Sequence, residues 1–173
     1  WQLLPLGPTS YGDSPYQSFS SAAGNPYFID LDMLCEDGLL SHAEIEAVDW
    51  GRDEGRVDYE KLYLNRFRIL KRAKQRGYGR DKAHIAAFVE ANRAWLLDYA
   101  LFMALKRHFG MLAWPNWPDD AARRHDEAAL AAYRIRLKPD IELFIYMQYL
   151  FFKQWQKLKS YTNSLGISII AVS

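Results

Sequence analysis

Two short apolar segments near the two ends of the 173-residue chain constrain its fold more than any other feature. The first, residues 1–6, ends at the turn-forming pair Gly7-Pro8. The second, residues 167–172, follows a long apolar helical pattern that begins near Pro139. This order predicts two buried, adjacent parallel strands with a helix leading into the second, because parallel strands are joined by helical crossovers.

Two strands alone do not form a stable parallel sheet, whereas a closed (β/α)8 barrel needs eight strands and about 250 residues. We therefore predict an α/β fold, mostly α by content: a fragment of a (β/α)8 TIM barrel with two adjacent parallel strands and a large helical insertion. The predicted parts are residues 1–40, a barrel strand and long loop; 41–137, a helical insertion subdomain; and 138–173, a barrel helix and the following strand.

Capping signals divide the insertion into helices. Ser41 followed by Glu44 forms a capping-box pattern, and Asp58 is a suitable N-cap for the next helix. Before the insertion, residues 27–29 favour a strand because their side chains are aromatic and β-branched. The helices expected after residue 40 cover residues 41–48, 58–77, 81–109, 119–137 and 139–165.

Composition and charge argue against several classes of function. Half of the residues are hydrophobic, so a packed core is expected, and the formal net charge of +1 argues against nucleic-acid or anionic-lipid partners. The longest apolar stretch, residues 143–152, is too short for a membrane span of about 20 residues. The single Cys35 fits a reducing compartment. Since the four histidines lack metal-ligand spacing, we predict no metal and no cofactor.

A long loop follows the first strand segment. Residues 9–26 are rich in Ser, Gly, Pro, Tyr and Asn, and loops of this length in compact domains are usually functional. The sequence reads WQLLPL over residues 1–6, GPTSYGDSPYQSFS over 7–20 and AGNPY over 23–27. Weaker motifs are ALKRHFG over 104–110, QW over 154–155 and YTNSLGISII over 161–170. Together these motifs resemble the amylomaltases, a family of 4-alpha-glucanotransferases in the alpha-amylase clan, around the second and third barrel strands.

The resemblance implies a transferase that moves α-1,4-glucan segments between maltooligosaccharides by a retaining mechanism, with a covalent Asp nucleophile and a Glu acid/base. Such chemistry needs two carboxyl groups roughly 5 Å apart. No Asp or Glu in this chain matches the family's pair, so we predict no catalytic residue here and expect the chain alone to be inactive. The family also continues with Gly-Asp where this chain reads Ala171-Val172-Ser173. The expected location is the cytoplasm, or the plastid for a plant sequence.

The loop in residues 1–40 is then a substrate-site loop. By the resemblance, Tyr16 lines the subsite for the cleaved glucose, and Ser14 is a polar partner for sugar hydroxyls. Tyr11 resembles a family aromatic residue that contacts glucan outside the main site. Alternatively, Tyr11 and Tyr16 brace a rigid loop. Asp13 is expected to hold backbone N–H groups of its own turn.

Three further expectations concern an alternative function and the partners of the chain. The insertion, residues 41–137, is long enough to form a core of its own, so a non-catalytic helical interaction module is the alternative function. The partner implied by the resemblance is an α-1,4-glucan or maltooligosaccharide, bound by the full-length enzyme. Because unpaired strand edges recruit further strands, self-association of the chain is also expected.

Overall fold

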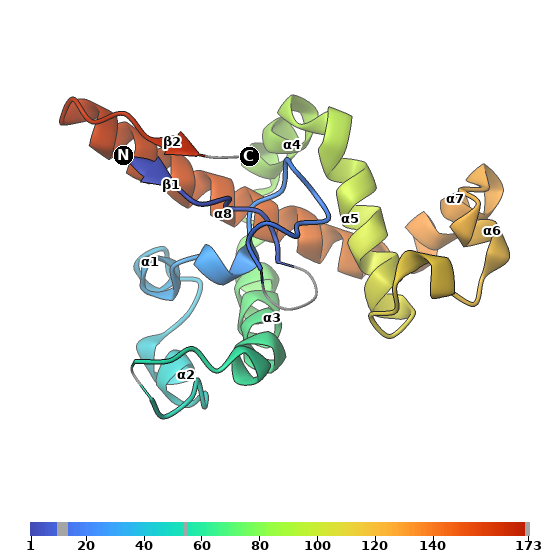
Figure 1. Ribbon diagram of the computed structural model, residues 1–173, viewed down its shortest axis with the longest axis horizontal. Helices are drawn as coiled ribbons and strands as arrows, with labels where there is room; N and C mark the ends of the chain where they lie inside the picture. Colours follow the sequence, from blue (N-terminus) through green and yellow to red (C-terminus); the bar gives the residue numbers. More distant parts are fainter. Residues whose placement is uncertain (10–13, 54, 172–173) are drawn as a thin grey trace.

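The computed structural model describes residues 1–9, 14–53 and 55–171 of the chain (Figure 1). One long helix, α8 (Lys138–Ser164), crosses the molecule, and helices from the rest of the chain pack along it. The helices with the most extensive contacts to α8 are α3 (Tyr59–Gly77), α4 (Lys82–Ala91), α5 (Arg93–His108) and α7 (Glu127–Arg136). The described chain is therefore mostly helical.

The two terminal segments lie side by side as a short parallel pair. Strand β1 (Gln2–Leu3) pairs with β2 (Ile170–Ala171), and the Ile170 N–H donates to the Trp1 carbonyl over 2.8 Å. Both strands are shorter than predicted. The expectation that they are buried is wrong for this chain, since the side chains of Trp1 and Ile170 are 71% and 64% exposed. The physical reason is that no further strand within the described residues flanks or covers the pair.

The predicted capping signals of the insertion are present. In α2 (His42–Glu46), the Ser41 hydroxyl accepts from the Glu44 N–H while the Glu44 carboxylate accepts from the Ser41 N–H, which completes the capping box. The Asp58 side chain caps α3 by accepting from the Lys61 N–H over 3.1 Å. These signals are local in sequence, so the sequence alone indicates where the two helices start.

The predicted strand over residues 27–29 is wrong. Residues Pro26–Phe28 form a 3-10 helix, and α1 (Leu31–Glu36) follows it. The Asn25 side chain accepts from the Tyr27 N–H, and Asp30 caps α1 by accepting from the Met33 N–H. These two caps and the proline at the first helical position outweigh the weak strand preference of the residues between them.

The predicted helix over residues 81–109 is two helices, α4 and α5, separated at Asn92. The Asn92 amide donates to the Phe88 carbonyl, and its oxygen accepts from the indole N–H of Trp95. A side chain that bonds the backbone of the preceding turn competes with the helix, which explains the break.

The stretch predicted as one helix over residues 119–137 is also divided. It contains α6 (Asp120–Arg123) and α7, with His125 between them at a φ of 56°. Asp126 begins α7 by accepting from the Ala129 N–H. The two prolines before this stretch allow only a 3-10 helix, Trp114–Asn116.

The hydrophobic core is shared between the insertion and α8. Its most deeply buried α8 residues include Leu143, Tyr146, Met147 and Leu150, and those of the insertion include Ile69, Leu70, Leu96 and Ala100. No helix within the described residues is both long and apolar enough to cross a membrane. The fold is thus a set of helices that bury their apolar faces on one central helix.

The capping box gives a prediction about acid stability. The Glu44 carboxylate accepts from Arg76 at 2.7 and 2.8 Å, and this pairing lowers the pKa of Glu44 from 4.5 to about 2. Because the pKa is lowered in the folded state, its stabilising effect is present above pH 4.5 and is lost as pH falls toward 2. We expect the melting temperature, measured from pH 6 to about 2, to fall more steeply for the wild type than for Glu44→Gln. Parallel pH profiles for the two proteins would contradict this.

Candidate functional site

The loop between β1 and α1 contains the predicted sugar-binding residues. The hydroxyl of Ser14 accepts from the Tyr16 N–H over 3.3 Å, and the Ser14 carbonyl accepts from the Gln17 N–H over 3.2 Å. The hydroxyl of Ser14 therefore shapes the turn, and the Tyr16 side chain, 68% exposed, projects from it. Tyr11 and Asp13 lie outside the described residues.

Tyr16 lines a cavity of about 530 Å³ between this loop and α8. We name it the Tyr16 cavity. Its walls include Leu6 at the end of the strand segment, Gly24 in the loop, and Phe151 and Trp155 on α8. The cavity thus combines aromatic side chains with backbone and serine groups of the loop, which suits a ligand with apolar faces and hydroxyl groups.

Two glutamines of α8 hold the loop by the same arrangement. The Gln148 amide oxygen accepts from the Gly24 N–H and its amide nitrogen donates to the Gly24 carbonyl, both over 2.8 Å. Gln154 pairs in the same way with Asp30, at 2.7 and 2.9 Å. Both ends of the loop segment from residue 24 to residue 30 are therefore fixed to one helix.

Arg66 of α3 holds the same segment from the other side. Its buried guanidinium donates to the carbonyls of Pro26, Tyr27 and Ile29. Burial lowers the pKa of Arg66 to about 10, so the side chain remains charged at neutral pH. One cation thus donates to three carbonyl groups in the 3-10 helix Pro26–Phe28 and at Ile29, just before α1.

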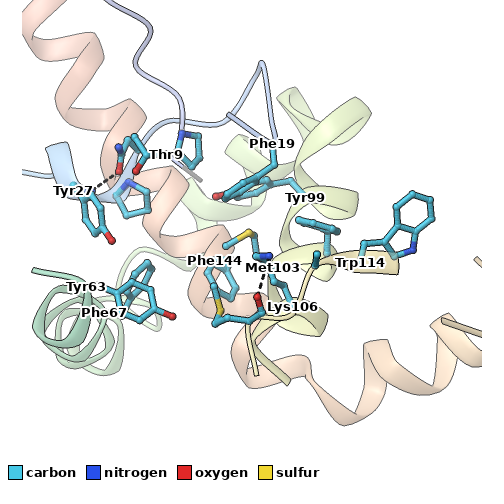
Figure 2. A pocket seen from close by; sticks show the side chains of 16 residues that line it. Thr9, Phe19, Tyr27, Tyr63, Phe67, Tyr99, Met103, Lys106, Trp114 and Phe144 are labelled. Carbon is cyan, nitrogen blue, oxygen red and sulfur yellow. Dashed lines mark hydrogen bonds between the residues drawn. The ribbon is translucent and has the colours of Figure 1, made fainter. Parts of the chain in front are cut away.

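A second cavity, of about 600 Å³, lies on the other side of the loop (Figure 2). We name it the aromatic cavity. Figure 2 shows ring side chains from the loop, from α3, α5 and α8, and from the 3-10 helices Pro26–Phe28 and Trp114–Asn116 around the space. They are Phe19, Tyr27, Tyr63, Phe67, Tyr99, Phe102, Trp114 and Phe144. No motif in the sequence predicts this cavity, although the four-residue spacing of Tyr63 and Phe67 on α3 is an available signal.

The loop forms a partition between the two cavities. Ser18 and Ser20 line the Tyr16 cavity, whereas Phe19 between them lines the aromatic cavity. Likewise, Gly24 lines the Tyr16 cavity and its neighbour Asn25 lines the aromatic cavity. The loop therefore changes sides at Phe19 and again between Gly24 and Asn25.

The described side chains that line the two cavities are mainly aromatic, aliphatic and hydroxyl groups. No Asp, Glu, His or Cys is among the residues that line either cavity within the described chain. The Lys106 ammonium in the aromatic cavity donates to the Met111 and Leu112 carbonyls, both at 3.3 Å. Burial raises the pKa of Tyr99, so its phenol stays protonated. No group of acidic, histidine or cysteine side chains in the described chain could hold a metal ion.

The chain is similar to 4-alpha-glucanotransferases along almost its whole length. The family model described as 4-alpha-glucanotransferase matches residues 1–172. The 4-alpha-glucanotransferase of Streptococcus pneumoniae is 47% identical over 171 residues, which cover 98% of this chain and 34% of that protein. The Thermus thermophilus 4-alpha-glucanotransferase is 46% identical over 174 residues, with the same coverage.

A solved structure extends the similarity to three dimensions. The amylomaltase from Streptococcus agalactiae in complex with acarbose superimposes with a TM-score of 0.95 at 42% sequence identity. The superposition covers 99% of this chain and 35% of that one. This chain therefore spans about a third of the length of the relatives it matches.

Proposed function

Because this chain belongs to the 4-alpha-glucanotransferase family, we propose that it forms the sugar-binding part of an enzyme that transfers α-1,4-glucan segments between maltooligosaccharides. The observation that carries the proposal is the exposed ring of Tyr16 at a cavity whose described lining contains no acid or base. This chain then binds and orients the glucan. The nucleophilic Asp and the acid/base Glu of the retaining mechanism come from outside these residues.

The ring of Tyr16 suits this role because a pyranose has an apolar face that packs on aromatic side chains, while its hydroxyls need polar partners. We assign Tyr16 to the subsite of the cleaved glucose. Ser14 shapes the turn before Tyr16, and we propose its hydroxyl as a polar partner for the sugar hydroxyls, although it is not among the described residues that line the Tyr16 cavity. The complex of the Streptococcus agalactiae amylomaltase with acarbose supports glucan-like ligands for this family. Tyr11 remains a proposed contact for glucan outside the main site.

The parallel pair β1–β2 supports a place in a (β/α)8 barrel. The exposed faces of Trp1 and Ile170 are of the kind that neighbouring strands cover. We propose that residues 1–40 and 138–173 contribute two adjacent barrel strands and that residues 41–137 are the insertion. In the absence of the neighbouring strands, the free edges of this pair favour self-association. The half-buried, unpaired Cys35 supports a reducing compartment such as the cytoplasm.

The alternative, a non-catalytic helical interaction module, needs a core within the insertion. The described core instead joins Ile69 and Leu96 of the insertion to Leu143 and Leu150 of α8. This shared core supports an insertion that depends on the rest of the chain.

The proposal is tested with the complete polypeptide that contains these residues. Incubated with maltotriose, it is expected to release glucose and to form longer maltooligosaccharides, whereas the 173-residue chain alone is expected to do neither. Product chromatography measures both. Absence of transfer by the complete polypeptide would contradict the proposed activity. Transfer that co-purifies with the 173-residue chain would contradict the location of the catalytic carboxyl groups outside it.

A further inference from the structure

Gln148 lies in the middle of α8, and its side chain is fully buried, with 0% exposed area. A buried amide is costly unless its donor and acceptor are both paired. Both are paired here with the backbone of one residue, Gly24, which is 124 positions away in the sequence. The side chain of Gln148 thus bonds both the N–H and the carbonyl of Gly24, as the backbone of a neighbouring β-strand would.

The surroundings of Gly24 restrict where the loop can lie along α8. A Cβ added to Gly24 would overlap the ring of Phe151, one turn beyond Gln148 on the same helix. The backbone of the loop therefore touches α8 between an amide that bonds it and a ring that packs on it. Because hydrogen bonds are directional and the ring excludes larger residues, this contact determines where residue 24 lies along α8.

Hydrogen bonds connect this contact to the rest of the Tyr16 cavity. The Ala23 N–H donates to the Ser20 hydroxyl over 3.1 Å, and the Ser20 N–H donates to the Ser18 hydroxyl over 3.2 Å. The Asn25 N–H donates to the Leu6 carbonyl over 2.8 Å. Gly24 lines the same cavity as Tyr16. The position of Gly24 on α8 therefore sets the position of the loop wall next to Tyr16.

We propose that Gln148 is a positioning residue for glucan transfer: by pairing with Gly24, it holds the loop that carries Tyr16 in the one arrangement that orients the bound sugar for reaction. The inference rests on the proposed function of the chain. Gln148 does not line the described Tyr16 cavity, so it acts on the sugar through the loop. Loss of the two hydrogen bonds of Gln148 is expected to change the orientation of the bound sugar more than its contact area with the cavity, because the aromatic side chains remain.

Gln154 provides a matched control on the same helix. It also forms two amide bonds to one backbone residue, Asp30, but at the start of α1, and it is not among the residues that line the described Tyr16 cavity. Replacing either glutamine by leucine removes two hydrogen bonds and keeps a side chain of similar size. Gln148 is fully buried and Gln154 is half-buried, so a purely structural role lowers the folded fraction more for Gln148→Leu than for Gln154→Leu. It leaves the activity per folded molecule similar for the two variants.

The experiment compares the complete wild-type enzyme, Gln148→Leu and Gln154→Leu with maltotriose as substrate. The folded fraction at the assay temperature is measured by circular dichroism, and the rates are expressed per folded molecule. We expect kcat of Gln148→Leu to fall roughly 10-fold or more, with a smaller change in KM, and kcat of Gln154→Leu to stay within about twofold of wild type. Equal kcat values for the two variants per folded molecule would overturn the proposal.

Gln148→Glu keeps the test decisive if the leucine variant does not fold. A protonated Glu can accept from the Gly24 N–H and donate to the Gly24 carbonyl, as the amide does, whereas a carboxylate cannot donate. The kcat of Gln148→Glu relative to wild type is therefore expected to rise at least about threefold as pH falls from 8 to 5, because burial raises the pKa of a carboxyl group. A ratio that is constant with pH would overturn the proposal. An inactive wild-type enzyme would instead reject the proposed function itself, and the role of Gln148 with it.

Discussion

Replacing Tyr16 by alanine in the complete enzyme is expected to lower kcat/KM for maltotriose by roughly 10²-fold or more. This corresponds to about 2.7 kcal/mol of transition-state stabilisation. The reason is that the ring of Tyr16 both contacts the sugar and orients it for attack, so its loss affects the chemical step as well as binding. Steady-state kinetics with maltotriose measures both parameters.

Controls separate this role from bracing of the loop. Tyr16→Phe keeps the ring and is expected to lower kcat/KM less than Tyr16→Ala. A large loss of kcat/KM in Tyr16→Phe would assign the role to the hydroxyl group. Because the ring is mostly exposed, Tyr16→Ala is expected to change the free energy of unfolding by no more than about 0.5 kcal/mol. Tyr59→Ala, at an exposed position where α3 begins, is expected to leave kcat/KM unchanged. Near-normal activity of Tyr16→Ala per folded molecule would disprove the stacking role.

The largest loss of stability is expected from Arg66→Met. Methionine keeps most of the apolar stem but removes the donors of the carbonyls of Pro26, Tyr27 and Ile29. The Pro26 carbonyl keeps the Ile29 N–H as a donor, so the loss falls mainly on the carbonyl of the buried Ile29. Since a buried acceptor without a partner costs about 1–3 kcal/mol, we expect the free energy of unfolding to fall by about 2 kcal/mol. Removing a buried charge offsets part of this loss, because the guanidinium is desolvated in the folded state.

Arg68→Met is the matched control for this change. Arg68 lies two residues further along α3, is exposed, and donates to the side chain of Asn65 over 2.8 Å. We expect its replacement to change the free energy of unfolding by about 0.5 kcal/mol or less. Denaturant titrations of the complete enzyme, followed by circular dichroism, compare the two. Coincident curves for Arg66→Met and Arg68→Met would show that the three carbonyls do not depend on Arg66.

The features that were predictable from sequence are those set by neighbouring residues. Ser41 with Glu44 and Asp58 mark helix starts because each cap bonds a backbone N–H three positions later. Gly166 after α8 adopts a φ of 75°, which glycine allows at low cost. The parallel arrangement of the terminal segments was also predictable, because a helix that precedes a strand constrains its direction.

The features that were missed depend on residues far apart in the chain. Gln148 interrupts an apolar stretch, and the sequence alone gives no reason for it, since its partner Gly24 is 124 residues away. The loop motif indicates Tyr16 and Ser14 as site residues. The aromatic cavity, in contrast, is formed by several helices, and no local sequence pattern predicts how these helices lie relative to one another. Phe102 of α5, for example, packs against the core and also lines that cavity.

The partition formed by the loop has a consequence for protein engineering. Tyr63 and Phe67 of α3 line the aromatic cavity, whereas Phe151 and Trp155 of α8 line the Tyr16 cavity, and the described linings have no residue in common. A mutant library confined to Tyr63 and Phe67 can therefore reshape the aromatic cavity while every described side chain of the Tyr16 cavity stays wild type. Phe19 lies on the partition itself, between Ser18 and Ser20 of the Tyr16 cavity, so substitutions at Phe19 belong in a separate library.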